Sequence, residues 1–425
     1  MFKLLTFFYI FSIPVIKNIS FINTTILVGI LFGIKIFINK KYLNTLKKIL
    51  SQRSVFKVYV GLILIILISI AIPTFHSTYD FSLVKTLINQ FICITIGIML
   101  FGYYKEKNKQ ENIIDDIVTA FIIQSLIQLI CLISPSINSI LNYFRSDNTI
   151  LIMQKYSGIR GLSISGSSFF GLAIGYGVAY VLFFTNYIKN KEMGKINKII
   201  SFLLLLFGGA SAGRTSLIGI ILGINLFIYD KIKYDGGSIK YKRFIKISPK
   251  KIVFNILLVI FMICGIKYLQ INQNKLQINS INQKVHYFLN YSLEFLNNFL
   301  EKGDFTTTST SKLFNNMYFK IPLRTYLLGD GYYTNIDGSY YMYTDAGYMR
   351  NLLYGGIMWL IFLFCYQILF FSWKKRYLIF NLAITLMILI FHIKGDVIGF
   401  SIMLQSIFIL ILMNQNSKCR GVLVE

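Results

Sequence analysis

The chain has 425 residues, of which 55% are hydrophobic and 14% are charged, and its mean hydropathy is +0.62. So few charged residues cannot cover the surface of a water-soluble protein of this length, which excludes an ordinary soluble enzyme. The formal net charge of +26 would suit nucleic acid, but the basic residues form short clusters between apolar runs instead of gathering on one domain, so we exclude that partner too.

Apolar segments long enough to cross the roughly 30 Å hydrocarbon core of a bilayer recur along the whole chain. In chain order, the predicted spans are 3–18, 20–38, 56–74, 83–103, 113–134, 166–187, 199–212, 215–229, 252–269, 347–371, 377–393 and 398–413. We therefore expect an all-α, polytopic membrane protein with about 12 transmembrane helices. The first span follows Lys3 as a signal peptide would, but no small-residue cleavage site comes after it, so we keep it as a helix.

Lysine and arginine gather in the short connections on one predicted side of the membrane. These basic clusters are 40–57, 105–109, 189–198, 231–251 and 374–376. Because cytoplasmic connections carry an excess of Lys and Arg, this alternation places both termini in the cytoplasm. The chain then divides into predicted helices 1–9 in 1–269, with an outer loop at 135–165; a large outer loop at 270–346; and helices 10–12 with a cytoplasmic tail in 347–425.

A break of small residues interrupts the apolar stretch 199–230, which lies between two basic clusters. Two short helices would meet at Gly208–Gly213, and short, glycine-interrupted helices often mark a site in membrane proteins. Arg214 follows the break, and the free N–H groups of the next helix would add to its affinity for an anion. The alternative is an interfacial arginine whose side chain reaches lipid head groups.

Several arginines fall on the predicted outer side, against the general bias of the basic residues. They are Arg145, Arg160, Arg214, Arg324 and Arg350. A guanidinium group binds phosphate through two parallel hydrogen bonds and stays charged at any relevant pH, so these residues indicate an anionic ligand. Arg160 precedes a helix whose glycines allow close packing, and its alternative role is that of a head-group anchor.

The end of the large outer loop combines a turn, several tyrosines and a carboxylate. The turn is Leu328–Gly331, and the tyrosines are Tyr332, Tyr333, Tyr340, Tyr341, Tyr343 and Tyr348. Aromatic faces stack on sugar rings, although tyrosine is also enriched at membrane interfaces. Asp345, at the mouth of the next helix, suits either a general base for a sugar hydroxyl or a helix N-cap. The histidines, His76, His286 and His392, lack metal-ligand spacing, so we assign them no role and predict no metal site.

The order of these features resembles the O-antigen polymerase family, which is related to the O-antigen ligases. The matching pieces are Gly158–Gly161 before a helix, Ser211–Ser216 at the short hairpin, Leu328–Gly331 in the large loop, and Asp345, Tyr348 and Gly355-Gly356 at the next helix. Some polymerases show an Arg-x10-Gly spacing in two outer loops; the pair Arg160 and Gly171 fits it, but neither Arg324 nor Arg350 does, so the second copy is absent. Ligases have a His-Asn pair at the end of the large loop, whereas this chain has Asp345-Ala346 there, which favours the polymerase.

The resemblance implies an enzyme of the bacterial inner membrane that polymerises lipid-linked oligosaccharide repeats at the periplasmic face. It would transfer the growing glycan from undecaprenyl diphosphate to another lipid-linked repeat. Arg214 and Asp345 are the expected catalytic residues, with Asp345 as the base. The expected substrate-binding residues are Arg160, Arg324, Arg350, Tyr340 and Tyr341.

The same resemblance implies neither cofactor nor metal, because the lipid diphosphate is itself an activated leaving group. Expected partners are the undecaprenyl-diphosphate-linked oligosaccharide, membrane lipids and, as a further candidate, a chain-length regulator protein; no nucleic acid is expected. Two alternatives stay open, an O-antigen ligase that transfers glycan to the lipid A core and a lipid-linked-oligosaccharide flippase. A flippase would favour internal repeats and charges near the bilayer midplane, and the sequence indicates neither.

Overall fold

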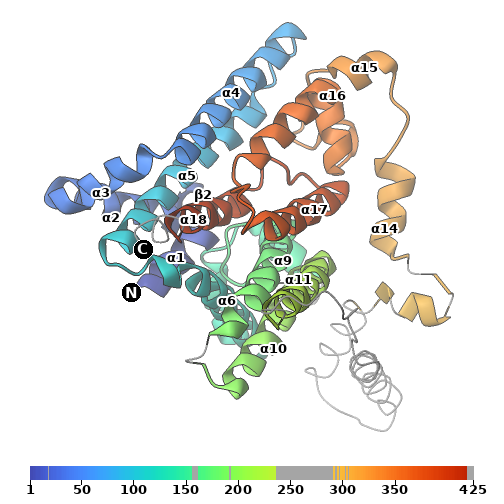
Figure 1. Cartoon of the computed structure of the whole chain (residues 1–425). Coiled ribbons are helices and arrows are strands. Elements are labelled where there is room, and N and C mark those ends of the chain that lie inside the picture. Colours follow the sequence, from blue (N-terminus) through green and yellow to red (C-terminus); the bar gives the residue numbers. More distant parts are fainter. Residues whose placement is uncertain are drawn as a thin grey trace, which may run out of the picture.

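The computed structural model describes residues 1–155 except 18, 161–235 except 191 and 192, and 291–418 except 292, 293, 296, 302 and 305. This part of the chain is almost entirely helical, and one small two-stranded sheet joins two of the helices (Figure 1). The expectation of an all-α membrane protein is thereby confirmed at the level of fold class.

The N-terminal half consists of long helices with short connections. Its elements are α1 (Phe2–Phe11), β1 (Pro14–Ile16), β2 (Ile19–Asn23), α2 (Thr24–Ile38), α3 (Lys40–Leu50), α4 (Arg53–Phe75), α5 (Ser82–Glu106), the 3-10 turn η1 (Gln110–Asn112), α6 (Ile113–Ile133), α7 (Pro135–Asn142), α8 (Asp147–Lys155), α9 (Phe169–Thr185) and the 3-10 turn η2 (Tyr187–Lys189).

The second half alternates long helices with short helical turns. Its elements are α10 (Lys195–Ala212), the 3-10 turn η3 (Arg214–Leu217), α11 (Ile218–Asp235), α14 (Thr308–Lys312), the π-helical turn η5 (Leu313–Met317), α15 (Leu323–Leu328), the 3-10 turn η6 (Tyr341–Tyr343), α16 (Gly347–Ile368), α17 (Leu378–Lys394) and α18 (Ile402–Lys418).

Among the residues described, seven helices are long and apolar enough to cross a membrane. They are Arg53–Phe75, Ser82–Glu106, Gln110–Ile133, Phe169–Lys189, Lys195–Ala212, Arg214–Ile232 and Gly347–Ile368. Four further apolar helices are shorter, namely Phe2–Phe11, Thr24–Ile38, Leu378–Lys394 and Ile402–Ser417. The predicted span 252–269 lies outside the described residues. The protein is therefore a multi-pass membrane protein.

The N-terminus differs from the prediction, because the expected helix 3–18 ends at Phe11. Ser12 has a left-handed backbone with φ of 44°, and Pro14 has no N–H to continue a helical hydrogen-bond ladder. The chain turns instead into the antiparallel pair β1–β2, with Pro14 opposite Asn23. Asn23 then caps α2 by accepting a hydrogen bond from the backbone N–H of Ile26 at 3.2 Å.

Helix α9 lies at the centre of the bundle and packs against α6, α10 and α11. Glycines on both helices allow α9 and α11 to pack closely. A Cβ atom at Gly219 of α11 would lie only 2.1 Å from the carbonyl oxygen of Gly177 in α9. On another side of α9, the Tyr180 hydroxyl donates to the Leu205 carbonyl of α10 at 2.9 Å. The helices α10 and α11 meet at Gly213, where the sequence predicts a break.

Helix α16 is kinked at Gly355 and Gly356, and Gly356 has a φ of 67°. The kink leaves the Leu353 and Tyr354 carbonyls without helical partners. The turn Leu328–Gly331 supplies them, since Asp330 N donates to Leu353 O at 2.6 Å and Gly331 N donates to Tyr354 O at 3.0 Å. The turn predicted from the glycines is therefore bonded directly to the helix that follows it in the sequence.

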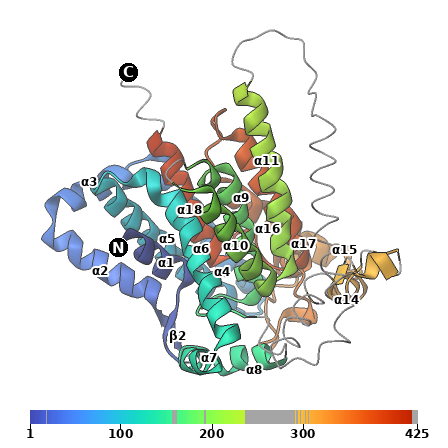
Figure 2. The same cartoon turned by 90° about the horizontal axis from the view of Figure 1, so that it is seen from below.

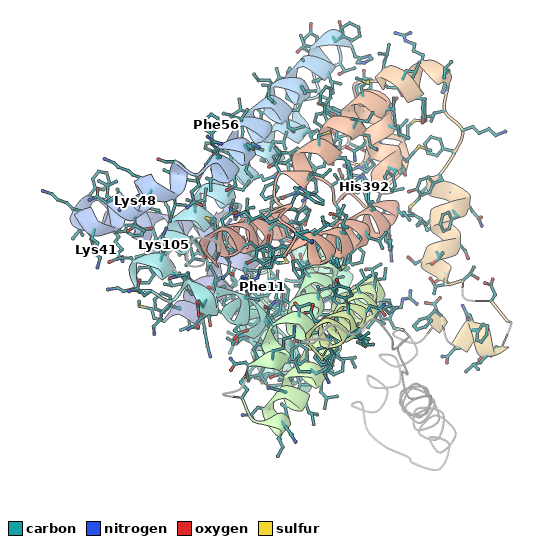
Figure 3. All side chains as sticks on the ribbon, viewed as in Figure 1. Phe11, Lys41, Lys48, Phe56, Lys105 and His392 are labelled. Atoms are coloured by element: carbon teal, nitrogen blue, oxygen red, sulfur yellow. The ribbon has the colours of Figure 1, made fainter. Side chains whose placement is uncertain are left out.

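The basic clusters of the described chain lie at one end of the bundle. Side-chain hydrogen bonds tie the last turns of α18 to the starts of α4 and α6, from Asn416 to Ser54 and from Asn414 to the Gln110 carbonyl. Lys41, Lys48 and Lys105 belong to α3 and α5, which pack together (Figure 3). Figure 2 shows α11 and α18 ending toward the top, whereas α7 and α8 lie at the bottom, at the other end of the bundle.

Candidate active site

A cavity of about 620 Å³ opens at the end of the bundle away from the basic clusters. Its wall is formed by the start of α9, the Gly213 break, the loop segment between 291 and 317, the first turn of α16 and residues 394–396 after α17. The lining includes four residues singled out from the sequence, namely Arg214, Tyr340, Asp345 and Arg350. Residues 136 positions apart in the chain thus meet at one site.

Arg350 lies in the first turn of α16 with its guanidinium group between two aromatic rings. Its Cζ atom is 4.1 Å from the ring centre of Tyr333 and 3.8 Å from that of Tyr340. The residue is 7% exposed, and its Nε atom has no hydrogen-bond partner among the described residues. No described carboxylate forms an ion pair with Arg350 either. A buried cation of this kind at a cavity has the chemistry to bind an anion.

Arg214 also lines the cavity, immediately after the Gly213 break. Its guanidinium group forms an ion pair with Glu294 and lies 4.8 Å from the ring centre of Tyr291. Glu294 also accepts hydrogen bonds from the N–H and hydroxyl of Thr308, at 2.8 and 2.9 Å. Partial burial acts to raise the pKa of Glu294, but these hydrogen bonds and Arg214 outweigh it, so the pKa lies below its usual value. Arg214 therefore faces the cavity already paired with an ionised carboxylate.

Asp345 lies in the cavity wall just before α16. The competing interpretation as a helix N-cap does not hold, because the cap position is taken by Ala346 and α16 has no side-chain cap hydrogen bond. Burial raises the pKa of the Asp345 carboxyl above its usual value, although a backbone hydrogen bond and the cations Lys394 and Arg350 act in the opposite direction. A carboxylate with a raised pKa is a stronger base than an ordinary aspartate.

The cavity carries more positive than negative groups. Its cationic side chains are Arg214, Lys312, Arg350 and Lys394, and its acidic ones are Glu294, Asp345 and Asp396. Lys312 comes from the last residue of α14 and Lys394 from the last residue of α17. The two lysines bring flexible point charges, which complement the fixed, planar groups of the arginines. The balance of charges suits a ligand that carries negative charge.

A buried polar network lies beneath Arg350 and was missed by the sequence analysis. The carboxylate of Asp396 accepts hydrogen bonds from the Tyr333 hydroxyl at 2.5 Å and from Asn351 Nδ2 at 3.0 Å. Asn351 in turn accepts from Trp359 Nε1 at 3.0 Å. Burial raises the pKa of Asp396, and the charge of Arg350 offsets this only in part. This network fixes the Tyr333 ring, and through it one face of the Arg350 stack.

His392, to which we assigned no role, belongs to the same network. The side chain is fully buried on α17 (Figure 3). Its Nδ1 atom accepts from the backbone N–H groups of Val397 and Ile398, at 3.0 and 3.2 Å. The signal in the sequence is the polar interruption Lys394-Gly395-Asp396 between two apolar spans, which places charges at the mouth of the bundle.

The remaining candidates lie elsewhere. Arg324 is exposed on α15 and does not line the cavity, and Tyr341 stacks on Tyr332 with 5.2 Å between ring centres. Arg160 lies outside the described residues. Arg145 has a structural explanation, since it is buried and donates to the Ser163 carbonyl at 2.8 Å and to Asn138 and Asn142. Within the described ranges, no group of His, Cys, Asp and Glu is arranged to hold a metal ion.

No protein-family description, no curated protein and no solved structure matches this chain. The functional assignment therefore depends on the chemistry of the cavity itself and on the resemblance noted in the sequence.

Proposed function

We propose that this protein is a membrane-embedded polymerase of lipid-linked oligosaccharide repeat units, as the resemblance to the O-antigen polymerase family implies. The observation that carries the proposal is Arg350, a buried cation that forms no ion pair with a described carboxylate and lies against two tyrosine rings at the wall of a cavity. Its natural counterpart is a ligand with negative charge. A diphosphate attached to a sugar and to a membrane lipid supplies that charge next to an apolar bundle.

In the proposed reaction, a hydroxyl oxygen of the acceptor repeat bonds to the anomeric carbon of the donor glycan. The bond from that carbon to the diphosphate oxygen breaks, and its electron pair leaves with undecaprenyl diphosphate. Arg350 stabilises the charge that develops on the leaving group, with Arg214 and Lys394 as further cations. Asp345 takes the proton of the attacking hydroxyl, for which its raised pKa suits it. Tyr340 offers an aromatic face to a sugar ring.

The same proposal includes the orientation in a bacterial inner membrane. The basic clusters lie at the end opposite the cavity, so the positive-inside bias puts that end and both termini in the cytoplasm and the cavity at the periplasmic face. In this arrangement about 12 spans cross the membrane and 270–346 is the large periplasmic loop, of which residues described from 291 onward line the cavity. A chain-length regulator would meet the protein on this face.

The experiment is a gel of surface glycolipids from a strain that lacks the gene, complemented with variants. A single repeat unit on the core without the polymer ladder is expected for the deletion, and the wild-type gene should restore the ladder. Arg350→Ala should fail to restore it, whereas Arg324→Ala, at an exposed arginine outside the cavity, should succeed. Polymer that accumulates on its lipid carrier would instead indicate a ligase. Loss of the ladder together with the single-repeat band would indicate a flippase.

A further inference from the structure

A second cavity, of about 510 Å³, lies at the opposite end of the same helices. It is lined by the last turns of α9 and α11 and the first turn of α17, whereas the first cavity touches the beginning of α9 and the end of α17. Since α17 has 17 residues, the two cavities are about 25 Å apart along the bundle. Figure 2 shows α11 and α18 running toward this end. The second cavity is therefore separate from the first and shares no lining residue with it.

The lining of the second cavity combines buried apolar side chains with cationic ones. Leu182, Leu226 and Ile411 are its buried apolar residues, called the floor below, and the buried polar residues Asn414 and Gln415 also line it. Among the cationic residues, Lys189 is bound to Asp230 at 2.6 Å. Lys375 and Arg376 form no ion pair or hydrogen bond through their side chains with any residue that the structure describes. Two positive charges of the lining are thus left uncompensated in that part of the chain.

Some residues that line this cavity are also exposed on the outside of the helices. Tyr229 of α11 and Leu378 and Ile379 of α17 line it and are 39%, 36% and 40% exposed. Exposed apolar side chains on helices of a multi-pass membrane protein lie against acyl chains. Trp373, just before the basic pair, is 42% exposed and has the amphipathic ring typical of the membrane interface. A molecule can therefore enter from the bilayer with its charged part at the water boundary.

We propose that the second cavity binds an anionic phospholipid, with the phosphate held by Lys375 and Arg376 and an acyl chain against the Leu226 floor. Three features together define this ligand: uncompensated cations, an apolar floor, and lateral access from the membrane. A soluble anion would use only the first of them, and a zwitterionic lipid would compensate the cations poorly. Basic pockets between transmembrane helices at the cytoplasmic boundary favour such lipids in general, and a cavity of this volume lies within the roughly 300–1,000 Å³ of small-molecule sites.

The test is native mass spectrometry of the detergent-purified full-length protein, titrated with dioleoyl phosphatidylglycerol or dioleoyl phosphatidylcholine. Lys375→Ala with Arg376→Ala should weaken phosphatidylglycerol binding about thirtyfold and phosphatidylcholine binding much less, because choline already offsets the charge of its phosphate. The matched control is Lys47→Ala with Lys48→Ala, which removes two exposed charges of α3 outside the cavity. An equal loss in both double variants would overturn the proposal, because the effect would then be general surface charge.

Two further measurements test the lipid nature of the ligand. Leu226→Trp fills the floor without a change in charge and should also weaken phosphatidylglycerol binding; unchanged binding would overturn the acyl-chain assignment. Inorganic phosphate should displace the lipid only at far higher concentration, and displacement at equal concentration would identify a site for a free anion instead. None of these readouts depends on catalytic activity, so their outcome is independent of the proposed function.

Discussion

Glu294 and Arg214 form an ion pair across the mouth of the first cavity, and both side chains line it. Glu294 occupies the place on Arg214 that a phosphate oxygen of the substrate would take. Arg350 forms no such ion pair with a described carboxylate. An anion that binds Arg214 through Nη1 would therefore compete with Glu294, whereas none of the described carboxylates is paired with Arg350.

Glu294→Gln is expected to strengthen donor binding. The amide keeps an acceptor for the hydrogen bonds from Thr308 but no longer neutralises Arg214. Because a partly exposed ion pair contributes up to about 1 kcal/mol, the KM for the lipid diphosphate donor should fall by up to about fivefold. The measurement is steady-state transfer by the purified protein. Glu301→Gln, at an exposed position of the same segment, is the control, and a higher KM in Glu294→Gln would contradict the competition.

Lysine at position 350 should not restore the full activity of arginine. Lysine keeps the charge but loses the planar group that lies between Tyr333 and Tyr340 and the paired N–H groups that match a phosphate. Removal of one such donor from a developing negative charge costs about 10²–10³ in kcat. We expect a loss of this size in Arg350→Ala and a partial recovery in Arg350→Lys. Wild-type kcat/KM in Arg350→Ala would exclude Arg350 from the reaction.

The activity should depend on pH through Asp345. The base is the ionised carboxylate, and its pKa is raised by burial, so kcat/KM should fall as the pH is lowered through that raised value. Asp345→Asn should remove this acid limb and lower kcat by about 10²–10⁴. Asp337→Asn, at an exposed carboxylate of the same loop, should keep both the rate and the pH profile. An acid limb that survives in Asp345→Asn would assign it to another group.

Asp80 is predicted to stabilise the loop that holds Tyr333. Its carboxylate accepts from the backbone N–H groups of Tyr333 and Thr334, at 2.7 and 2.8 Å. Hydrogen bonds to charged groups contribute about 1.5–3 kcal/mol, so Asp80→Asn should lower the thermal melting temperature. Partial burial acts to raise the pKa of Asp80, but the hydrogen bonds from Ser82, Thr334 and Tyr333 outweigh it and leave this pKa below its usual value.

The sign of the pH effect on stability follows from this lowered pKa. The contribution of Asp80 is fully present above the unfolded-state pKa of about 3.9 and is lost as the pH falls through the lower folded-state value. The difference in melting temperature between wild type and Asp80→Asn should hold from pH 5 to 8 and shrink below about pH 4. A difference that grows on acidification would contradict the assignment.

The sequence indicated candidate site residues best where a charged residue adjoins an apolar segment, because such a placement costs free energy. Arg214, Arg350 and Asp345 stand at the ends of apolar runs, and charge at such places is rarely without a partner or a ligand, so a single sequence marks them as candidates. All three line one cavity in the structure. The helices themselves follow from hydropathy, because a backbone in lipid has to satisfy its own hydrogen bonds.

What sequence could not predict is how distant segments meet. Asp396 accepts a hydrogen bond from Tyr333, 63 residues earlier, and no local pattern links them. Nothing in the sequence distinguishes Glu294 from the other acidic residues, and only the fold brings it into an ion pair with Arg214. The end of α1 at Phe11 depends on the conformation of Ser12 and on Pro14, short-range features that an apolar run obscures. Arg324 was chosen for its residue type alone, and the fold leaves it on the exposed side of α15.

The kink at Gly355 and Gly356 divides α16 into two segments. The segment Gly347–Tyr354 carries Arg350 and is fastened to the Leu328–Gly331 turn by two backbone hydrogen bonds, whereas the segment after Gly356 is the longer part anchored in lipid. Two links join these segments across the kink, the Gly355-Gly356 backbone and the hydrogen bond from Trp359 Nε1 to Asn351. A tilt of the longer segment, as bilayer thickness varies, would reach the network beneath Arg350 through that tryptophan.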